Sequence, residues 1–258
     1  MSARPAPTSS APAWPDGTAR HLLASVDSTN AEASRLAPTL SGPAWILAGQ
    51  QTAGRGRRAR TWSSPPGNFH ATLIFRPDML PAQAALHSFA AALALRDALV
   101  ALTDFPQAFT LKWPNDVLLN GGKLAGILLE SASHGTHIAH LAIGIGVNLI
   151  AAPDPSLLDQ GALNPVTLLE ETGLRIPPET LLDHLAPAFA ARAAQLTRGF
   201  TETRTDWLAH ASHIGQPIRA RTAQHTHHGT FTTIDDTGAL ILHTPAGPLA
   251  IPAAEVFF

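Results

Sequence analysis

The sequence predicts a globular body that mixes β-strands with α-helices, followed by a small β-barrel. Apolar residues make up 45% of the 258 positions, which is ample for a sizeable core. Up to residue 211, strand-like stretches are interspersed with alanine-rich helical ones. The last 46 residues contain only short apolar stretches separated by turn residues, a pattern typical of a small barrel that could be SH3-like.

We expect the chain to divide into three parts. Residues 1–20 are rich in Ala, Pro and Ser and lack the apolar run of a signal peptide, so they are predicted to form a flexible tail. Residues 21–212 form the body, and residues 213–258 form the barrel. The length fits one large domain, or a medium domain with a small companion.

The predicted elements follow from local patterns. Thr29-x-x-Glu32 has the spacing of a capping box, which predicts a helix that begins near Asn30 and ends before Pro38. Asn120-Gly121-Gly122 predicts a tight hairpin turn, because Asn and Gly tolerate positive φ. Apolar alternation or short apolar runs predict strands at Ala44–Ala48, Phe69–Phe75, Phe109–Trp113, Val117–Leu119, Lys123–Glu130 and Ile138–Leu149. Further helices are predicted at Pro81–Leu102, Pro165–Thr172, Pro178–Thr197 and Thr201–Ala211.

Composition excludes several classes of protein. A net charge of −2 excludes a broad basic surface, so no extended nucleic-acid interface is expected. The absence of cysteine excludes disulfides, thiolate metal sites and cysteine nucleophiles. The most apolar helical stretch, Pro81–Leu102, is interrupted by charged residues and is predicted to be a core helix rather than a membrane anchor. A cytoplasmic enzyme is the simplest interpretation.

Residues 49–68 form a long segment without apolar periodicity, and such segments inside compact domains are usually functional or disordered. Glycines let a backbone approach a ligand closely, and arginine forks bind phosphate or carboxylate. The segment therefore predicts a loop that gathers an anionic ligand. A solvated arginine run and a nucleic-acid contact remain open alternatives. The residues that support the prediction are Gly54, Arg55, Gly56, Arg57, Arg58 and Arg60.

Lysine usage indicates a second candidate site. Of the 17 basic residues only Lys112 and Lys123 are lysines, and both lie in one short stretch around Trp113-Pro114-Asn115-Asp116. A lysine offers a compact, mobile point charge where arginine offers a flat fork. Lys123 precedes the small residues Ala125 and Gly126, so it could lie along a substrate wall. Chance clustering on a solvated hairpin is the alternative.

Five motifs, taken together, resemble the biotin protein ligase family in order and spacing. They are Ser28-Thr29-Asn30, Gln51-Thr52-Ala53-Gly54-Arg55-Gly56-Arg57-Arg58, Lys112-Trp113-Pro114-Asn115-Asp116, Lys123-Leu124-Ala125-Gly126-Ile127-Leu128 and Gly144-Ile145-Gly146-Val147-Asn148. The resemblance runs from about residue 25 to the C-terminus. It implies an α/β (α+β) catalytic domain with a central mixed sheet and flanking helices, related to the lipoate ligases, and a C-terminal SH3-like domain.

The resemblance also implies roles for individual residues. Ser28, Thr29 and Gln51, with Asn30 beside them, would hold the ureido head of biotin. Lys123, with Arg57 and Asp116, would carry out catalysis. The remaining binding residues would be Gly54, Arg55, Gly56, Arg58, Arg60, Trp62, Lys112, Asn115, Gly126 and Asn148.

The implied reaction consumes ATP with Mg²⁺ and converts biotin to biotinyl-5′-AMP. The biotin is then transferred to one lysine of a biotin carboxyl carrier protein. Many members carry an N-terminal DNA-binding domain for which the first twenty residues leave no room, so no repressor activity is expected. Neither a nucleic-acid nor a membrane partner is expected, whereas a homodimer is possible because many relatives dimerise through the sheet.

Other interpretations stay open at this point. A lipoate or octanoate ligase or transferase of the related fold is the nearest alternative, and a nucleic-acid-binding module is the alternative from another class. Two histidine groups could suggest metal sites, but their spacing in predicted hairpins favours solvated loop histidines, so no metal-binding residues are assigned. These groups are His134, His137 and His140, and His225, His227 and His228.

Overall fold

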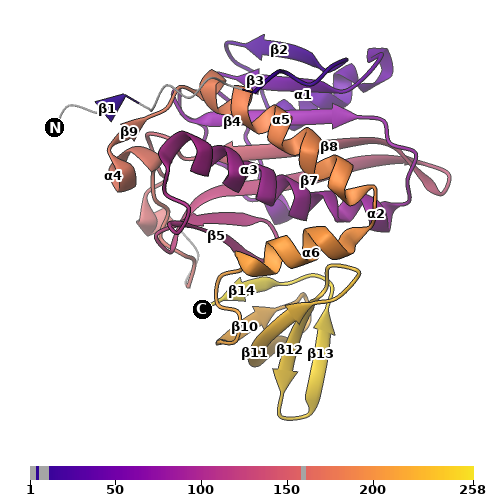
Figure 1. Cartoon of the computed structure of the whole chain (residues 1–258), viewed down its shortest axis with the longest axis vertical. Coiled ribbons are helices and arrows are strands. Elements are labelled where there is room, and N and C mark those ends of the chain that lie inside the picture. The colour runs from indigo at the N-terminus through magenta and orange to yellow at the C-terminus, as the bar shows by residue number, and fades with distance from the viewer. Residues whose placement is uncertain (1–3, 6–11, 158–160) are drawn as a thin grey trace.

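A computed structural model of the chain describes residues 4–5, 12–157 and 161–258. Its main sheet has seven strands in the order β2-β3-β4-β8-β7-β6-β5, and only the β2–β3 pairing is parallel (Figure 1). The predicted mixed central sheet is therefore confirmed. Its strands are β2 (Ala19–Leu23), β3 (Ala44–Ala48), β4 (Phe69–Phe75), β5 (Phe109–Lys112), β6 (Asp116–Leu119), β7 (Gly122–His134) and β8 (His137–Val147).

Long helices cover one face of this sheet, and α1 lies against the other. A second, five-stranded antiparallel sheet lies beyond α6 and is consistent with an SH3-like domain (Figure 1). The helices are α1 (Thr29–Leu36), α2 (Pro81–Ala85), α3 (His87–Thr103), α4 (Leu168–Thr172), α5 (Pro178–Leu196) and α6 (Phe200–Ala209). The small sheet contains β10 (Pro217–Arg221), β11 (Thr226–Ile234), β12 (Leu240–Thr244), β13 (Gly247–Ile251) and β14 (Glu255–Phe257). Short 3₁₀ turns lie at Ala37–Thr39, Arg57–Ala59 and Pro155–Leu157.

Two helix predictions need correction. The predicted helix Pro165–Thr172 begins only at Leu168, because residues 164–166 exchange backbone hydrogen bonds with Lys123 and are extended. The capping box at Thr29 and Glu32 does not form. Ser28 occupies the N-cap, and the Thr29 hydroxyl is used in a tertiary contact instead.

The predicted tail also needs correction. Ala19 and Arg20 already belong to β2, and the Trp14 indole donates to the Thr18 carbonyl oxygen at 2.8 Å. The backbone of Arg4–Pro5 forms β1, which pairs with β9 (Leu174–Arg175). The rest of the predicted tail, residues 1–3 and 6–11, lies outside the described residues.

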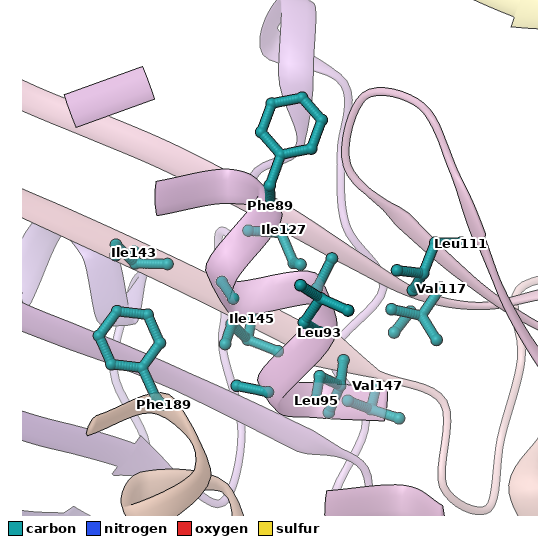
Figure 2. Close-up of a cluster of buried hydrophobic side chains, with 14 of the residues drawn as sticks. Phe89, Leu93, Leu95, Leu111, Val117, Ile127, Ile143, Ile145, Val147 and Phe189 are labelled. Carbon is teal, nitrogen blue, oxygen red and sulfur yellow. The ribbon is translucent and has the colours of Figure 1, made fainter. Parts of the chain in front are cut away.

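Strand periodicity divides the main sheet into two different faces. Ile143, Ile145 and Val147 of β8 point into the core beneath α3, together with Ile127 of β7 (Figure 2). The alternate positions of these strands point to the opposite face, on which α1 lies.

The apolar helical stretch Pro81–Thr103, which contains α2 and α3, would be long enough to cross a membrane, but 67% of its most apolar window is buried in the protein. It serves as a core helix.

Aromatic packing joins the two sheets through α3 and α6. Phe89 of α3 makes edge-to-face contacts with Phe200 and Trp207 of α6, at ring-centroid distances of 5.2 and 5.4 Å. The Trp113 indole donates to the Gly238 carbonyl oxygen at 2.9 Å. Gly238 has a φ of +81°, and a Cβ atom there would lie 2.7 Å from the Phe89 ring. Only glycine satisfies both conditions at this turn.

We expect the substitution Gly238→Ala to loosen this junction. Gly215→Ala is a matched control just before β10 of the same small sheet, because Gly215 has a φ of +77° and a Cβ atom there would meet nothing within 4 Å. Both alanines carry the cost of a left-handed backbone, but only the first overpacks Phe89. Denaturant unfolding should show that Gly238→Ala lowers the free energy of unfolding by about 1–3 kcal/mol more than the control does. Equal losses would contradict this account of the junction.

Candidate active site

A cavity of about 550 Å³ lies over the glycine-rich end of the main sheet. Every residue that the sequence suggested for catalysis or binding lines it, except Gly54. A Cβ atom at Gly54 would lie 2.5 Å from the Trp62 carbonyl oxygen, so this glycine permits a close backbone approach within the loop. The lining residues are Ser28, Thr29, Asn30, Gln51, Arg55, Gly56, Arg57, Arg58, Arg60, Trp62, Lys112, Asn115, Asp116, Lys123, Gly126 and Asn148.

The absence of side chains at two glycines makes room for Trp62 on the sheet. Gly126 and Gly146 are paired across β7 and β8 and lie on the face opposite the core. A Cβ atom at Gly146 would lie 2.4 Å from the Trp62 indole nitrogen, and one at Gly126 would lie 3.2 Å from its ring. The indole nitrogen is buried and, within the described part of the chain, has no hydrogen-bond partner. The cavity thus has a flat aromatic wall carrying an unused donor.

A polar group at the start of α1 forms one end of the cavity. The backbone nitrogen and the hydroxyl of Thr29 lie 2.8 and 3.1 Å from Oε1 of Gln51. The Gln51 amide nitrogen donates to the Ser64 hydroxyl at 2.8 Å. These bonds fix the orientation of the Gln51 amide, and the buried residue Ser28 lines the same cavity. Such a set of fixed donors and acceptors suits a small polar head group.

Three of the loop arginines are paired with carboxylates outside the loop. Arg55 donates to Glu130 at 3.1 Å, and Arg58 and Arg60 reach Glu255 at 3.1 and 2.6 Å. Hydrogen bonding, first from Arg60, holds the pKa of Glu255 down at about 2, so this carboxylate is charged. The loop is therefore held by acidic groups from β7 and from the small sheet.

Arg57 differs from the other three arginines, because it is half-buried where they are exposed. Its Nη1 donates to Oδ1 of Asn115 at 3.2 Å, and the Asn115 amide nitrogen donates to the Ile127 carbonyl oxygen at 2.6 Å. Burial lowers the pKa of Arg57, and the nearby charge of Asp116 opposes this shift. An anionic ligand would compensate for the cost of burying this guanidinium.

The two lysines lie at the same end of the cavity. Nζ of Lys123 forms an ion pair with Oδ1 of Asp116 at 2.8 Å and lies 5.8 Å from the Trp62 ring centre. Lys112 is more deeply buried, which lowers its pKa, and its Nζ lies 5.3 Å from the Phe258 ring centre. The arginine loop and the lysine hairpin, far apart in sequence, thus converge on one cavity.

Sequence reasoning missed the contributions of β14 and of Glu130. Glu255, Val256 and Phe257 line the cavity, although they belong to the small sheet. Their sequence, at the end of a short apolar stretch, carries no signal of a site. Glu130 contacts the loop from a strand 75 residues further along the chain, a separation that no local pattern can reveal.

The histidine groups form no metal site in the described part of the chain, where no cluster of three or more His, Cys, Asp or Glu side chains could hold an ion. Their side chains are exposed or half-buried on hairpins.

Comparisons with known proteins agree with this geometry. The biotin/lipoate A/B protein ligase family matches residues 22–148, and the biotin protein ligase C-terminal domain matches residues 213–258. A biotin–[acetyl-CoA-carboxylase] ligase of Paracoccus denitrificans is 56% identical over 92% of this chain and 99% of its own length. One from Mycobacterium tuberculosis is 33% identical over 91% of this chain and 87% of its own length.

Structural similarity leads to the same fold. A biotin protein ligase from Aquifex aeolicus, solved with biotin and ATP, superposes with a TM-score of 0.76, covering 92% of this chain and 98% of its own, at 24% identity. At that identity it supports the fold alone. The sequence relatives are much closer and extend across both sheets, and they establish that this chain belongs to the biotin protein ligase family.

Proposed function

We propose that the protein activates biotin with ATP as biotinyl-5′-AMP and transfers it to a lysine of a biotin carboxyl carrier protein. The observation that carries this proposal is the convergence of Arg57, Lys112 and Lys123 on one cavity in a chain that is 56% identical to a biotin–[acetyl-CoA-carboxylase] ligase. Three cationic groups at one point suit a reaction between two anions. We place the reaction in the cytoplasm.

The polar end of the cavity would hold the biotin head. Its ureido group offers one carbonyl acceptor and two N–H donors, and Ser28, Thr29 and Gln51 supply matching groups. Trp62 would cover the apolar ring system. The acid group of biotin would then extend towards Lys123, which lies next to the Trp62 ring.

In the first step, a carboxylate oxygen of biotin attacks the α-phosphorus of ATP. The bond from that phosphorus to the bridging oxygen breaks, and pyrophosphate leaves. The two reacting groups are both anionic, so their repulsion must be cancelled where water is largely excluded. Lys123 can contact both groups, and Arg57 can bind the phosphate from the loop, since Arg57 contacts Asn115 and Lys123 contacts the neighbouring Asp116.

The family implies Mg²⁺, and the donor set fits it. Mg²⁺ is usually held by one or two carboxylates together with substrate phosphates, and Asp116 and Asn148 offer oxygens on the cavity wall. When bound there, the ion would neutralise phosphate charge.

In the second step, Asp116 would also orient the incoming lysine amine of the carrier. That nitrogen, as the neutral amine, attacks the acyl carbon, the carbon–oxygen bond breaks and AMP leaves, and the proton released from the nitrogen would pass to the Asp116 carboxylate.

One assay distinguishes the proposed function from two alternative functions. A lipoate or octanoate ligase of the related fold would release pyrophosphate from ATP with those acids rather than with biotin. A nucleic-acid-binding module would consume no ATP, and its binding would weaken steeply with salt. We expect pyrophosphate release that depends on biotin.

Replacing Lys123 by alanine should lower biotin-dependent pyrophosphate release by about 10²–10³-fold or more, because a charge aimed at the reacting phosphate is lost. Lys123→Arg should recover little, since a planar fork cannot take the place of a point charge. Arg198→Ala, which removes an exposed cation paired with Glu202, is the control and should keep normal activity. Near-normal turnover by Lys123→Ala with an unchanged melting temperature would show that the reacting groups lie elsewhere.

Arg57→Gly should let the adenylate escape. The variant loses a charged hydrogen bond to Asn115 and adds backbone freedom in the loop, and a bond of this kind contributes about 1.5–3 kcal/mol. The release rate of biotinyl-5′-AMP, measured by trapping it with hydroxylamine in solution, should therefore rise by about tenfold or more. An unchanged release rate would rule out a covering role for the loop.

A further inference from the structure

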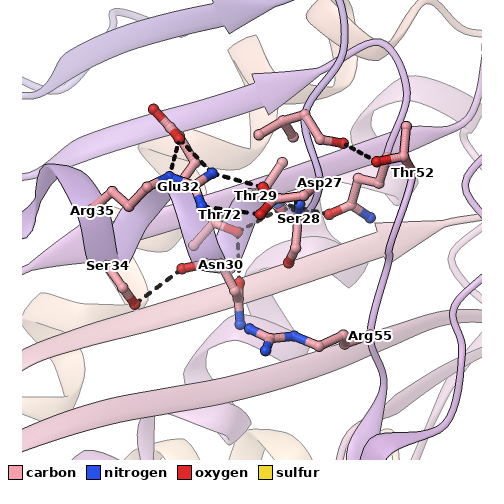
Figure 3. Close-up of polar contacts among 12 residues, drawn as sticks. Asp27, Ser28, Thr29, Asn30, Glu32, Ser34, Arg35, Thr52, Arg55 and Thr72 are labelled. Carbon is pink, nitrogen blue, oxygen red and sulfur yellow. Dashed lines mark hydrogen bonds and ion pairs between the residues drawn. The ribbon is translucent and has the colours of Figure 1, made fainter.

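A continuous hydrogen-bonded path connects the arginine loop to the polar end of the cavity. Oε2 of Glu130 accepts from Nη2 of Arg55 at 3.1 Å and from Nδ2 of Asn30 at 2.9 Å. Oδ1 of Asn30 lies 2.7 Å from the Thr72 hydroxyl, which in turn lies 2.8 Å from the Thr29 hydroxyl. Figure 3 shows Arg55 directed towards Asn30 at the start of α1.

The path continues from Thr29 to Gln51 and on to Ser64, whose hydroxyl donates to the Trp62 carbonyl oxygen at 3.2 Å. It therefore begins and ends on the same loop. Arg55 is at one end of the path and Trp62 at the other, and the path passes through residues of β7, α1 and β4.

The register of the sheet explains why Glu130 can reach the loop. Gly126, Leu128 and Glu130 alternate along β7 with core residues such as Ile127, so all three face the cavity side. Leu128 pairs with Gly144, where a Cβ atom would lie 2.3 Å from the Asn30 side chain. The glycine makes room for Asn30 to lie flat on the sheet and reach Glu130.

We infer that Glu130 is a positioning residue that latches the arginine loop through Arg55 and holds Asn30 in place. This inference rests on the proposed function and goes beyond it by assigning a role to a residue outside the motifs. The Asn30 side chain is occupied by Glu130, the Leu128 carbonyl and Thr72, so it acts on the site through its neighbours. Arg55, in turn, fixes the loop.

The strength of the latch is limited by solvent. The side chains of Arg55 and Glu130 are 48% and 35% exposed, and exposed ion pairs contribute about 0.2–1 kcal/mol. That is enough to change the fraction of time that the loop is open by about 1.4- to fivefold, while leaving the overall fold intact. The latch should therefore act on retention of the adenylate rather than on its formation.

The test compares Glu130→Gln, Arg55→Ala and the double variant with the wild type. Glutamine keeps an acceptor for Asn30 but removes the charge that holds Arg55. Each single variant should release biotinyl-5′-AMP about two- to fivefold faster, and the double variant should be no faster than the singles. The rate of adenylate formation by Glu130→Gln should stay within twofold of wild type. Glu171→Gln, at an exposed glutamate bonded to Asn120, is the matched control and should behave as wild type.

The salt dependence of adenylate release and the rate of trypsin cleavage are two further measurements. A purely structural role of Glu130 would change neither. Adding 0.5 M NaCl should raise the release rate of the wild type more than that of Glu130→Gln, because the pair is already broken in the variant. Trypsin should cleave the ligand-free loop after Arg57, Arg58 or Arg60, sites that all the variants keep, several-fold faster in Glu130→Gln and Arg55→Ala than in the wild type. The trypsin comparison needs no biotin.

The two possible failures can be told apart. If the wild type forms no adenylate from biotin, the proposed function is wrong, and the trypsin comparison alone decides whether the latch exists. If the wild type forms adenylate but release and cleavage by Glu130→Gln match those of the wild type, the latch is wrong. Additive effects in the double variant would also overturn it.

Discussion

The charge balance around one cavity is the constraint on which the rest of this structure depends. Four arginines and two lysines line the cavity, and their mutual repulsion would open the site if nothing opposed it. Carboxylates from three different elements do so, namely Asp116 on β6, Glu130 on β7 and Glu255 on β14. The cations still outnumber the carboxylates, so the cavity remains suited to anionic ligands.

The two faces of the main sheet have opposite tasks. One face buries branched apolar side chains under α3 and α5 and supplies the stability of the protein. The other face carries glycines at positions 126, 144 and 146. Because these residues have no side chain, Trp62 and Asn30 can lie directly on the strands. Rigid strands thus carry the site, while side-chain contacts from Glu130 and Glu255 hold the arginines of the loop above them.

Local patterns predicted much of this fold, because strand periodicity and turn chemistry are properties of neighbouring residues. The strands Ala44–Ala48 and Phe69–Phe75 lie where their apolar runs placed them, and Asn120 and Gly121 have the positive φ expected of the tight turn. The capping box at Thr29 failed for the opposite reason, since a distant glutamine competes for the same hydroxyl. The roles of Glu130 and Glu255 also depend on contacts between distant parts of the chain, so no sequence motif predicted them.

The central claim is that these charges join the acid group of biotin to the α-phosphate of ATP. Its most direct test uses biotin labelled with ¹⁸O in both carboxyl oxygens, with ATP and a carrier protein. If the carboxylate attacks the α-phosphorus and the carrier amine then attacks the acyl carbon, the AMP that is formed must carry one ¹⁸O atom, which mass spectrometry detects. Unlabelled AMP, or no AMP formed in response to biotin, would contradict the account.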